Sequence, residues 1–415
     1  MISVNKYQFP NGLRLLHHYD GATRMVAVNL LYDVGSRDED PACTGLAHLC
    51  EHLMFTGTDE VGQYDTELQK AGGDSNAWTN TDVTNYYETL PAHNLETALW
   101  LESDRLQHLR LSQESVDTQK KVVIEEFKQR SLNVPYGDLS HILNGAAFKV
   151  HPYRWPVLGL TTDHIAQVTR DDVVKFFKGH YAVNNLIMAI SGNVKFDDAV
   201  RLVDKWFGSI APVELQERKL PQEPPQREAR LVKKHSDVPQ DLLYIAYHMC
   251  GRRDADYQAC DLLSDVLANG TSSRFFRNVL MKSEVFTDLD AAVTGTLDPG
   301  LFLVRGRLRD GHTFAEAQQL VDEQLSLLLD KGVTEYELAK CTNKFHSNLL
   351  FDNIGYADKA LRLCEYENIS AADDVNHEVE KYRRLNPEVV KHVSEQLFRP
   401  ENSITLHYGP GVEDC

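Results

Sequence analysis

Short apolar stretches of strand length alternate along the chain with longer segments of helical periodicity. The strand-like stretches include VAVNLLYDVG, which ends at Gly35, TNYYETL (84–90) and NLIMAISGNV (185–194). The segments TELQKAGG and NLETALWLESDRLQHLRL are typical of amphipathic helices, and Gly72-Gly73 is predicted to end the first. This alternation predicts an α+β fold.

The order of these features occurs twice. VAVNLLYDVG is followed by the loop SRDED and a helical segment, and LLYIAYHMCG (242–251) is followed by RRDAD and a second helical segment. Arg37-Asp38 then matches Arg253-Asp254, and Gly57-Thr58 matches Gly270-Thr271. The repeat indicates duplication and predicts two homologous α/β-sandwich domains of about 200 residues each.

A proline-rich stretch separates the two halves. The segment APVELQERKLPQEPPQREAR (211–230) contains four prolines among charged residues. Proline stiffens the backbone and removes hydrogen-bond donors, so the segment is interpreted as a linker. The predicted organisation is an N-terminal domain (1–215), a linker (216–230) and a C-terminal domain (231–415).

The composition is that of an ordinary globular protein, with 42% hydrophobic and 25% charged residues. No apolar run reaches the roughly 18 residues of a membrane span, and MISVNKYQFPNGLRLL lacks the pattern of a secretory signal, so we expect neither. The formal net charge of −18 would repel nucleic acid phosphates, so we expect no nucleic acid partner.

The seven cysteines form no CxxC pair and no dense framework. In a chain of this length they are predicted to be reduced thiols of a cytoplasmic protein. They are Cys43, Cys50, Cys250, Cys260, Cys341, Cys364 and Cys415.

The segment TGLAHLCEHLMF (44–55) carries the clearest chemical pattern, H-x-x-E-H. With Thr44 as the predicted N-cap, a helix would place His48 and His52 on one face, as two imidazole ligands of one metal require. Glu51 would flank that face, where a carboxylate can deprotonate a metal-bound water. A catalytic zinc needs a third protein ligand.

The helix-compatible segment KKVVIEEFKQR (120–130) offers that ligand as Glu125 or Glu126. The alternative is a solvated helix face with no metal. The mostly apolar neighbours of the histidines favour a buried helix, where three ionisable groups are costly unless they are paired or metal-bound. In the second half, the matching positions are Asp261, Ser264 and Asp265, so only the first half has the ligand pattern.

In these motifs the chain resembles the pitrilysin/insulinase family of inverzincin metallopeptidases, and within it the short branch of half-length subunits. The resemblance covers most of the N-terminal half and is weaker in the C-terminal half. It rests on GLAHLCEHLMFTGT (45–58), GGDSNAWTNTDVTNYYE (72–88), VVIEEF (122–127), HPYRWPVLG (151–159) and HYAVNNLIMAISGNV (180–194).

The resemblance implies a zinc-dependent endopeptidase with one zinc per chain. His48, His52 and Glu126 would be the zinc ligands, with Glu125 as the alternative to Glu126, and Glu51 would act as general base on the zinc-bound water. Peptides or unfolded segments would be cleaved inside a clamshell of two subunits. Asn76-Ala77 would bind the substrate as an added β-strand, although Asn76 is also typical of a turn after Gly72-Gly73.

One departure from the family concerns an Arg and a Tyr that bind substrate opposite the zinc. Counted from Ser273-Arg274-Phe275-Phe276, these positions hold Leu280 and Thr287. We therefore expect a heterodimer in which a related zinc-free subunit supplies the pair, with a homodimer as the alternative; Arg274, Arg277 and Arg305 are alternative donors. The competing functions are a non-catalytic scaffold of the same family and a regulatory subunit.

Overall fold

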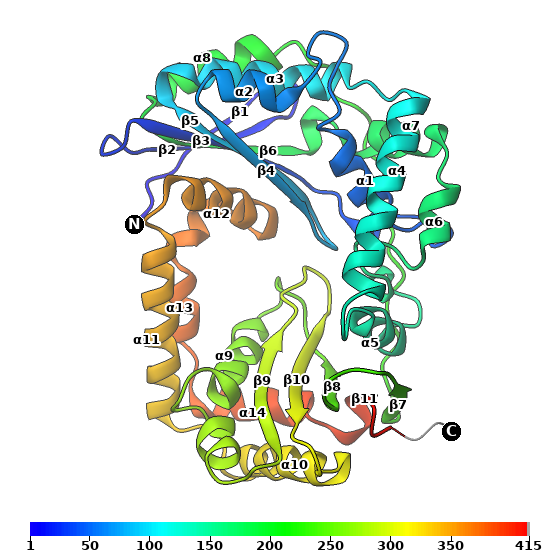
Figure 1. Cartoon of the computed structure of the whole chain (residues 1–415). Helices are drawn as coiled ribbons and strands as arrows, with labels where there is room; N and C mark the ends of the chain where they lie inside the picture. The colour runs from blue at the N-terminus through cyan, green and yellow to red at the C-terminus, as the bar shows by residue number, and fades with distance from the viewer. Residues whose placement is uncertain (413–415) are drawn as a thin grey trace. The chain divides into compact units, whose positions relative to one another are not determined.

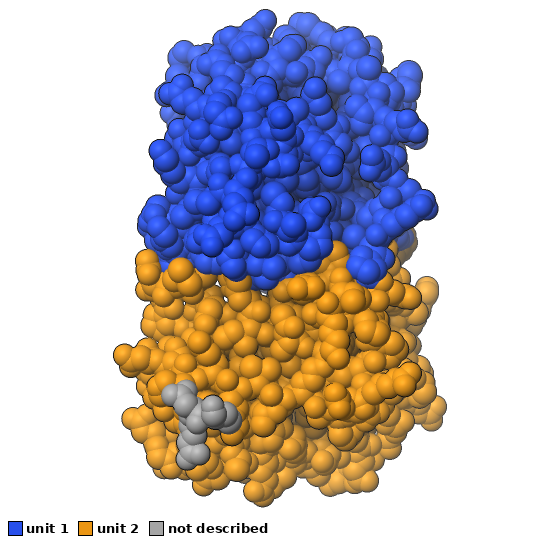
Figure 2. Space-filling view, turned by 90° about the vertical axis from the view of Figure 1, so that its right-hand side faces the viewer, with its two compact units in different colours: residues 1–130, 155–221, 349–376 blue, residues 131–154, 222–348, 377–415 orange. Residues whose placement is uncertain are grey.

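Residues 1–412 are described by the computed structural model, and they divide into two units (Figures 1 and 2). Unit 1 consists of Met1–Arg130, Trp155–Pro221 and Leu349–Asn376. Unit 2 consists of Ser131–Arg154, Gln222–Asn348 and the chain from His377 onwards. Each unit thus includes a segment from the half of the sequence that mainly builds the other. The predicted domains 1–215 and 231–415 were drawn from the repeat in the sequence and not from contacts in the structure, and they stay a prediction.

Unit 1 is built on a six-stranded sheet with the order β1-β2-β6-β3-β5-β4. β2 and β6 are parallel, and the other neighbouring strands are antiparallel. The strands are β1 (Asn5–Gln8), β2 (Arg14–Tyr19), β3 (Met25–Tyr32), β4 (Asp74–Thr79), β5 (Thr84–Pro91) and β6 (Leu186–Gly192).

Both faces of this sheet are covered by helices. Along β3, Val28 and Leu30 pack into the main helical core, whereas Leu31 belongs to the cluster that contains α12, as the two-residue period of a strand requires. Figure 1 shows α3 and α8 on one side and α12 on the other. The helices are α1 (Leu46–Leu53), α2 (Tyr64–Lys70), α3 (Leu95–His108), α4 (Gln113–Phe127), α6 (Thr162–Gln167), α7 (Arg170–His180), α8 (Phe196–Phe207) and α12 (Tyr356–Ile369).

Unit 2 repeats the arrangement with five strands in the order β7-β11-β8-β10-β9. β7 and β11 are parallel and the remaining pairs antiparallel, so these strands correspond in order to β2, β6, β3, β5 and β4. The mixed α and β fold predicted from the sequence is confirmed. The strands are β7 (Arg230–His235), β8 (Leu242–His248), β9 (Phe286–Val293), β10 (Leu301–Leu308) and β11 (Ser403–Gly409).

The helices of unit 2 also cover both faces of its sheet. Ile245 packs with α9, α10 and α14, whereas Ala246 packs with Leu143 and Ala147 of α5, which comes from the first half of the chain. The helices are α5 (Leu139–Ala147), α9 (Tyr257–Ala268), α10 (Phe314–Lys331), α13 (Glu378–Arg383) and α14 (Pro387–Leu397); α11 (Glu335–Asp352) spans the boundary of the two units.

The linker region runs along unit 1. Residues 211–221 contain no helix or strand, and Arg218 forms ion pairs of 3.1 Å with Asp33 and 2.6 Å with Asp38.

Six cysteines are free thiols in the described chain, while Cys415 lies outside it. The predicted cytoplasmic location stays a prediction. No helix within residues 1–412 has both the length and the apolar composition to cross a bilayer.

Candidate metal centre and active site

α1 carries the H-x-x-E-H residues, and its N-terminus is held by a carboxylate from the preceding loop. Gly45 occupies the N-cap position with a left-handed backbone (φ of +91°), which glycine adopts without strain. Glu39 accepts hydrogen bonds from the backbone amides of Gly45 (2.9 Å) and Ala47 (2.8 Å). These bonds satisfy amides that a helix leaves unpaired at its start and fix the entry into α1.

The prediction that Thr44 is the N-cap is wrong. Its hydroxyl lies 2.9 Å from His164 Nδ1 and accepts a hydrogen bond from the backbone amide of Leu160 (2.8 Å). Thr44 therefore ties the loop before α1 to the segment around α6, and the buried Glu39 carries out the capping instead.

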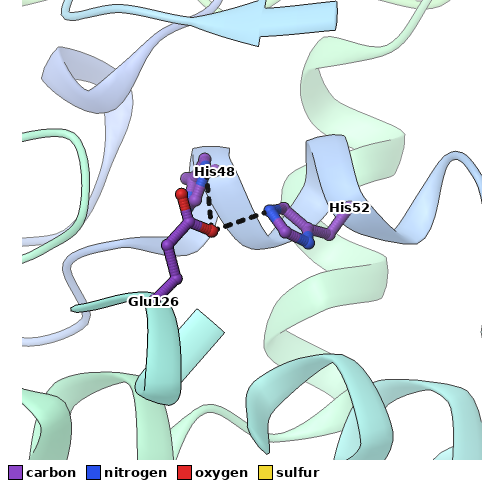
Figure 3. Close-up of side chains that lie close together, drawn as sticks. All are labelled: His48, His52 and Glu126. Carbon is purple, nitrogen blue, oxygen red and sulfur yellow. Dashed lines mark ion pairs between the residues drawn. The ribbon is translucent and has the colours of Figure 1, made fainter. Parts of the chain in front are cut away.

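The structure brings His48, His52 and Glu126 together, although Glu126 comes from α4 (Figure 3). Glu126 Oε2 lies 3.3 Å from His52 Nε2 and 3.8 Å from His48 Nε2. One ligand atom of each residue lies within 4.8 Å of the other two. No other group of three or more histidine, cysteine, aspartate or glutamate side chains within the described residues meets this criterion.

The donor set fits a zinc ion. Zinc–ligand bonds of about 2.0–2.1 Å in a tetrahedron place neighbouring ligand atoms roughly 3.4 Å apart, close to the two distances to Glu126. Burial, followed by the charges of His52 and Arg130, lowers the pKa of His48 to about 3, so its imidazole is neutral and has a free lone pair. Two imidazoles and one carboxylate also leave the open position of a catalytic zinc site.

The two candidate carboxylates on α4 have different surroundings. Glu125 is mostly exposed and pairs with Lys128 at 2.6 Å. Glu126 is mostly buried, and its Oε1 pairs with Arg130 at 3.0 Å while Oε2 faces the histidines. The geometry therefore favours Glu126 as the third ligand.

Glu51 lies beside this cluster in a pocket of about 950 Å³. Burial raises the pKa of its carboxyl group, the Glu126 carboxylate adds to the rise, and a hydrogen bond from Thr79 opposes it. The pocket is lined by His48, Glu51, His52, the end of β4 (residues 76–79), one face of α4, residues 129 and 130 after it, Val157 and Leu158.

Asn76 and Ala77 lie on β4, at the edge of the sheet. β4 pairs with β5 on one side, and no described strand pairs with its other side. Asn76 Oδ1 accepts a hydrogen bond from the amide of Ala77 (2.8 Å). The alternative interpretation of Asn76 as a turn residue is wrong, because Asn76 is paired with Tyr87 within the strand.

The corresponding helix of unit 2, α9, carries Asp261, Ser264 and Asp265. Asp261 accepts a 2.5 Å hydrogen bond from the hydroxyl of Tyr382, and Asp265 accepts one from Asn269. The positions of the H-x-x-E-H residues of α1 are thus occupied on α9 by side chains with local partners.

The positions where the family has an Arg and a Tyr hold unrelated side chains. Leu280 ends the π-helical turn η6 (Phe276–Leu280) and packs against the core of unit 2. Thr287 lies exposed on β9 and donates to the carbonyl of Arg307 at 3.2 Å. Arg274 is bound to Glu337 at 2.8 Å, so it is already occupied by a structural contact.

Sequence reasoning gave no role to several other polar residues that line the pocket, among them Thr79 and Arg130. Thr79 shares a strand face with Ala77, two residues earlier, and its contact with Glu51 depends on how β4 lies against α1. Arg130 follows Glu126 by four residues, a helical spacing that would have indicated a contact.

Comparisons with known proteins point to one peptidase family. The family model described as "Insulinase (Peptidase family M16)" matches residues 14–159, and the model described as "Peptidase M16 inactive domain" matches residues 167–345. The first covers the candidate metal centre, and the second covers α9. The fold and the two matches are those of a two-domain metallopeptidase. The chain belongs to the M16 peptidase family.

Similar proteins occur in bacteria and in a plant. The zinc protease PqqE of Helicobacter pylori is 28% identical over 411 residues, which cover 96% of this chain and 91% of that protein. A probable mitochondrial-processing peptidase subunit beta of Arabidopsis thaliana is 25% identical over 360 residues, covering 82% and 66%. The crystal structure of a protease from Helicobacter pylori has a TM-score of 0.91 at 26% identity and covers 98% of this chain and 100% of that one.

Proposed function

We propose that this protein is a zinc-dependent endopeptidase that uses Glu51 as its general base. The observation that carries the proposal is the convergence of His48, His52 and Glu126, with ligand atoms within 4.8 Å of one another, in the pocket that also contains Glu51. Family membership and the zinc proteases among the relatives support the same reaction.

The three clustered side chains would hold one zinc per chain. Zinc bound there would lower the pKa of a water molecule and polarise the scissile carbonyl. Glu51 would accept a proton from the attacking water and deliver it to the leaving amine, so no covalent enzyme intermediate is required. The open edge of β4 would bind the peptide as an additional strand next to Asn76 and Ala77, which suits peptides and unfolded segments.

Zinc content and peptide hydrolysis, measured on matched variants, test this proposal. Glu51→Gln should keep about one zinc per chain and lose hydrolysis by ~10²-fold or more, because only the base is removed. Glu126→Gln should lose zinc, whereas Glu125→Gln, the same exchange one residue earlier, should keep it. Normal turnover of Glu51→Gln would refute the role of Glu51, and a metal-replete wild type without zinc would favour a scaffold.

We further propose that the active form is a heterodimer with a related zinc-free subunit. Leu280 and Thr287 lack the donors that the family places opposite the zinc, and the Arabidopsis relative is named as one subunit of a processing peptidase. The chain alone should then be poorly active and gain activity when its partner is added. Full activity of a purified homodimer would contradict this arrangement.

A further inference from the structure

Thr79, the last residue of β4, contacts the proposed base directly. Its hydroxyl Oγ1 lies 2.5 Å from Glu51 Oε2, and both residues line the pocket. An ionised carboxylate only accepts hydrogen bonds, so the hydroxyl is the donor. Among residues 1–412, no other side chain is hydrogen-bonded to Glu51.

We propose that Thr79 is a positioning residue that orients Glu51 for catalysis, an inference that rests on the proposed peptidase function. Holding Oε2 fixes the rotation of the carboxylate and leaves Oε1 free to accept the proton of the attacking water. Without this bond the side chain can rotate among several staggered conformations, and only a fraction of them present an oxygen to the water.

The backbone around Thr79 is held firmly enough for this role. Thr79 pairs with Thr84 across the β4–β5 hairpin. The turn between them is closed by a bond from the Asn80 amide to the Val83 carbonyl (3.0 Å), and Asn80 Oδ1 accepts hydrogen bonds from the amides of Asp82 (2.7 Å) and Val83 (2.8 Å). A side chain mounted on such a turn has a well-defined position.

The same hairpin is docked onto the loop that leads into α1. The amide of Ser36 donates to the carbonyl of Asn80 (3.1 Å), and the amide of Arg37 donates to that of Thr81 (3.0 Å). Glu39, two residues further along this loop, caps α1. The hairpin that carries Thr79 and the helix that carries Glu51 are therefore both hydrogen-bonded to the same short loop. These bonds fix the distance between the two side chains.

This arrangement also links the base to the strand that would bind substrate. A peptide added to the outer edge of β4 would pair along the strand that ends in Thr79. Binding would depend mainly on the backbone of β4, which a change of the Thr79 side chain leaves in place. Removal of the hydroxyl should therefore lower kcat and leave KM nearly unchanged.

The test compares Thr79→Val, which keeps the β-branched shape and removes the donor, with Thr79→Ser, which keeps the donor. In the full chain, with its partner subunit where activity requires one, Thr79→Val should lower kcat ~10- to 100-fold. KM should stay within about threefold, and zinc content and melting temperature should match the wild type. Thr79→Ser should recover most of kcat. Thr66→Val, the same exchange at an exposed site on α2 outside the pocket, is the control and should behave as the wild type.

Crystal structures of the two Thr79 variants give a readout that does not depend on activity. The Glu51 carboxylate should lose its single orientation in Thr79→Val and keep it in Thr79→Ser. An unchanged kcat or an unchanged Glu51 in Thr79→Val would overturn the inference, as would an equal loss in Thr79→Ser. An inactive wild type would count against the peptidase proposal, and the Glu51 orientation would still decide the role of Thr79.

Discussion

Arg105 lies at the centre of a fully buried group of charges in unit 1. It donates to Glu102 through Nε (2.8 Å) and Nη2, and Nη2 lies 3.5 Å from Glu88 Oε1. The Tyr64 hydroxyl lies 2.5 Å from Glu88 Oε1 and 2.7 Å from Glu102 Oε1, within hydrogen-bond distance of both. The guanidinium carbon also lies 5.3 Å from the ring centre of Phe55, which follows α1. One cation thus faces two carboxylates in the core.

Replacing Arg105 with Met should destabilise unit 1 by about 3–5 kcal/mol near pH 8, because removal of one partner leaves buried charge uncompensated. Met has a similar length and fills most of the space, so the loss reports mainly on charge. The matched control is Arg201→Met, which removes an Arg that is 67% exposed and 3.3 Å from Asp198. Its effect should stay within about 0.5 kcal/mol.

The loss should also depend on pH. Burial, with the Glu102 carboxylate adding to it, raises the pKa of Glu88 well above that of a free glutamate. The folded state therefore binds more protons than the unfolded state above the unfolded pKa, and this group lowers stability as pH rises. In Arg105→Met the carboxylate pair has to take up one further proton, at about 1.4 kcal/mol per pH unit. Between pH 8 and pH 5.5 the loss should then shrink by about 3.5 kcal/mol, to roughly 0–1.5 kcal/mol.

Tryptophan fluorescence can follow this unit alone. The four tryptophans, Trp78, Trp100, Trp155 and Trp206, all belong to unit 1. Urea unfolding of wild type and both variants at pH 5.5 and 8 gives the free energies of unfolding. A loss below about 1 kcal/mol at pH 8, or an equal loss at both pH values, would refute the idea that Arg105 neutralises a buried carboxylate pair.

Two further predictions concern other parts of the fold. Gly35→Ala should destabilise unit 1 by about 1–3 kcal/mol in the same fluorescence assay and should lower kcat. An added Cβ would lie 2.6 Å from backbone atoms of Asn80 and Asp82 and would push the β4–β5 hairpin away from the loop before α1. Wild-type stability and turnover in this variant would contradict the prediction. Burial raises the pKa of Glu337, but hydrogen bonds from Arg274 and Thr334 outweigh it and lower the pKa to about 2. The ionised Glu337 therefore stabilises the fold above the pKa of an unfolded glutamate, and this stabilisation is lost as the pH falls towards 2. Glu337→Gln should lower the free energy of unfolding by about 1–3 kcal/mol at pH 7 and by clearly less at pH 3. Circular dichroism during urea unfolding measures both values. An equal cost at both pH values would argue against this ion pair.

The local pattern of the sequence was enough to predict the helix with His48 and His52 and four of the strands, β3, β5, β6 and β8. A helix of known register fixes which side chains share a face, so the two imidazoles could be placed together before any tertiary structure was known. The position of Glu126 came from the family resemblance, and the structure adds the physical difference between it and the exposed, ion-paired Glu125.

Features that depend on contacts between distant segments were not predictable from pattern alone. Thr44 has the chemistry of an N-cap, yet the carboxylate of Glu39 reaches the same amides from a loop whose path local sequence does not encode. The contact between Thr79 and Glu51 depends on the docking of a hairpin onto that loop. Likewise, nothing in the periodicity of α5 or α12 indicates which sheet each helix covers.

The placement of α12 has a consequence for synthesis of the protein on the ribosome. The face of the first sheet that includes Leu16, Leu31 and Ile187 is covered by a helix that emerges only after residues 222–348 have been translated. At about 5–20 residues per second this delay is roughly 6–25 s, during which an apolar surface of the nascent chain is exposed to water. Chaperones that bind nascent chains would find their target there, and translation stopped before residue 356 would release a product prone to aggregate.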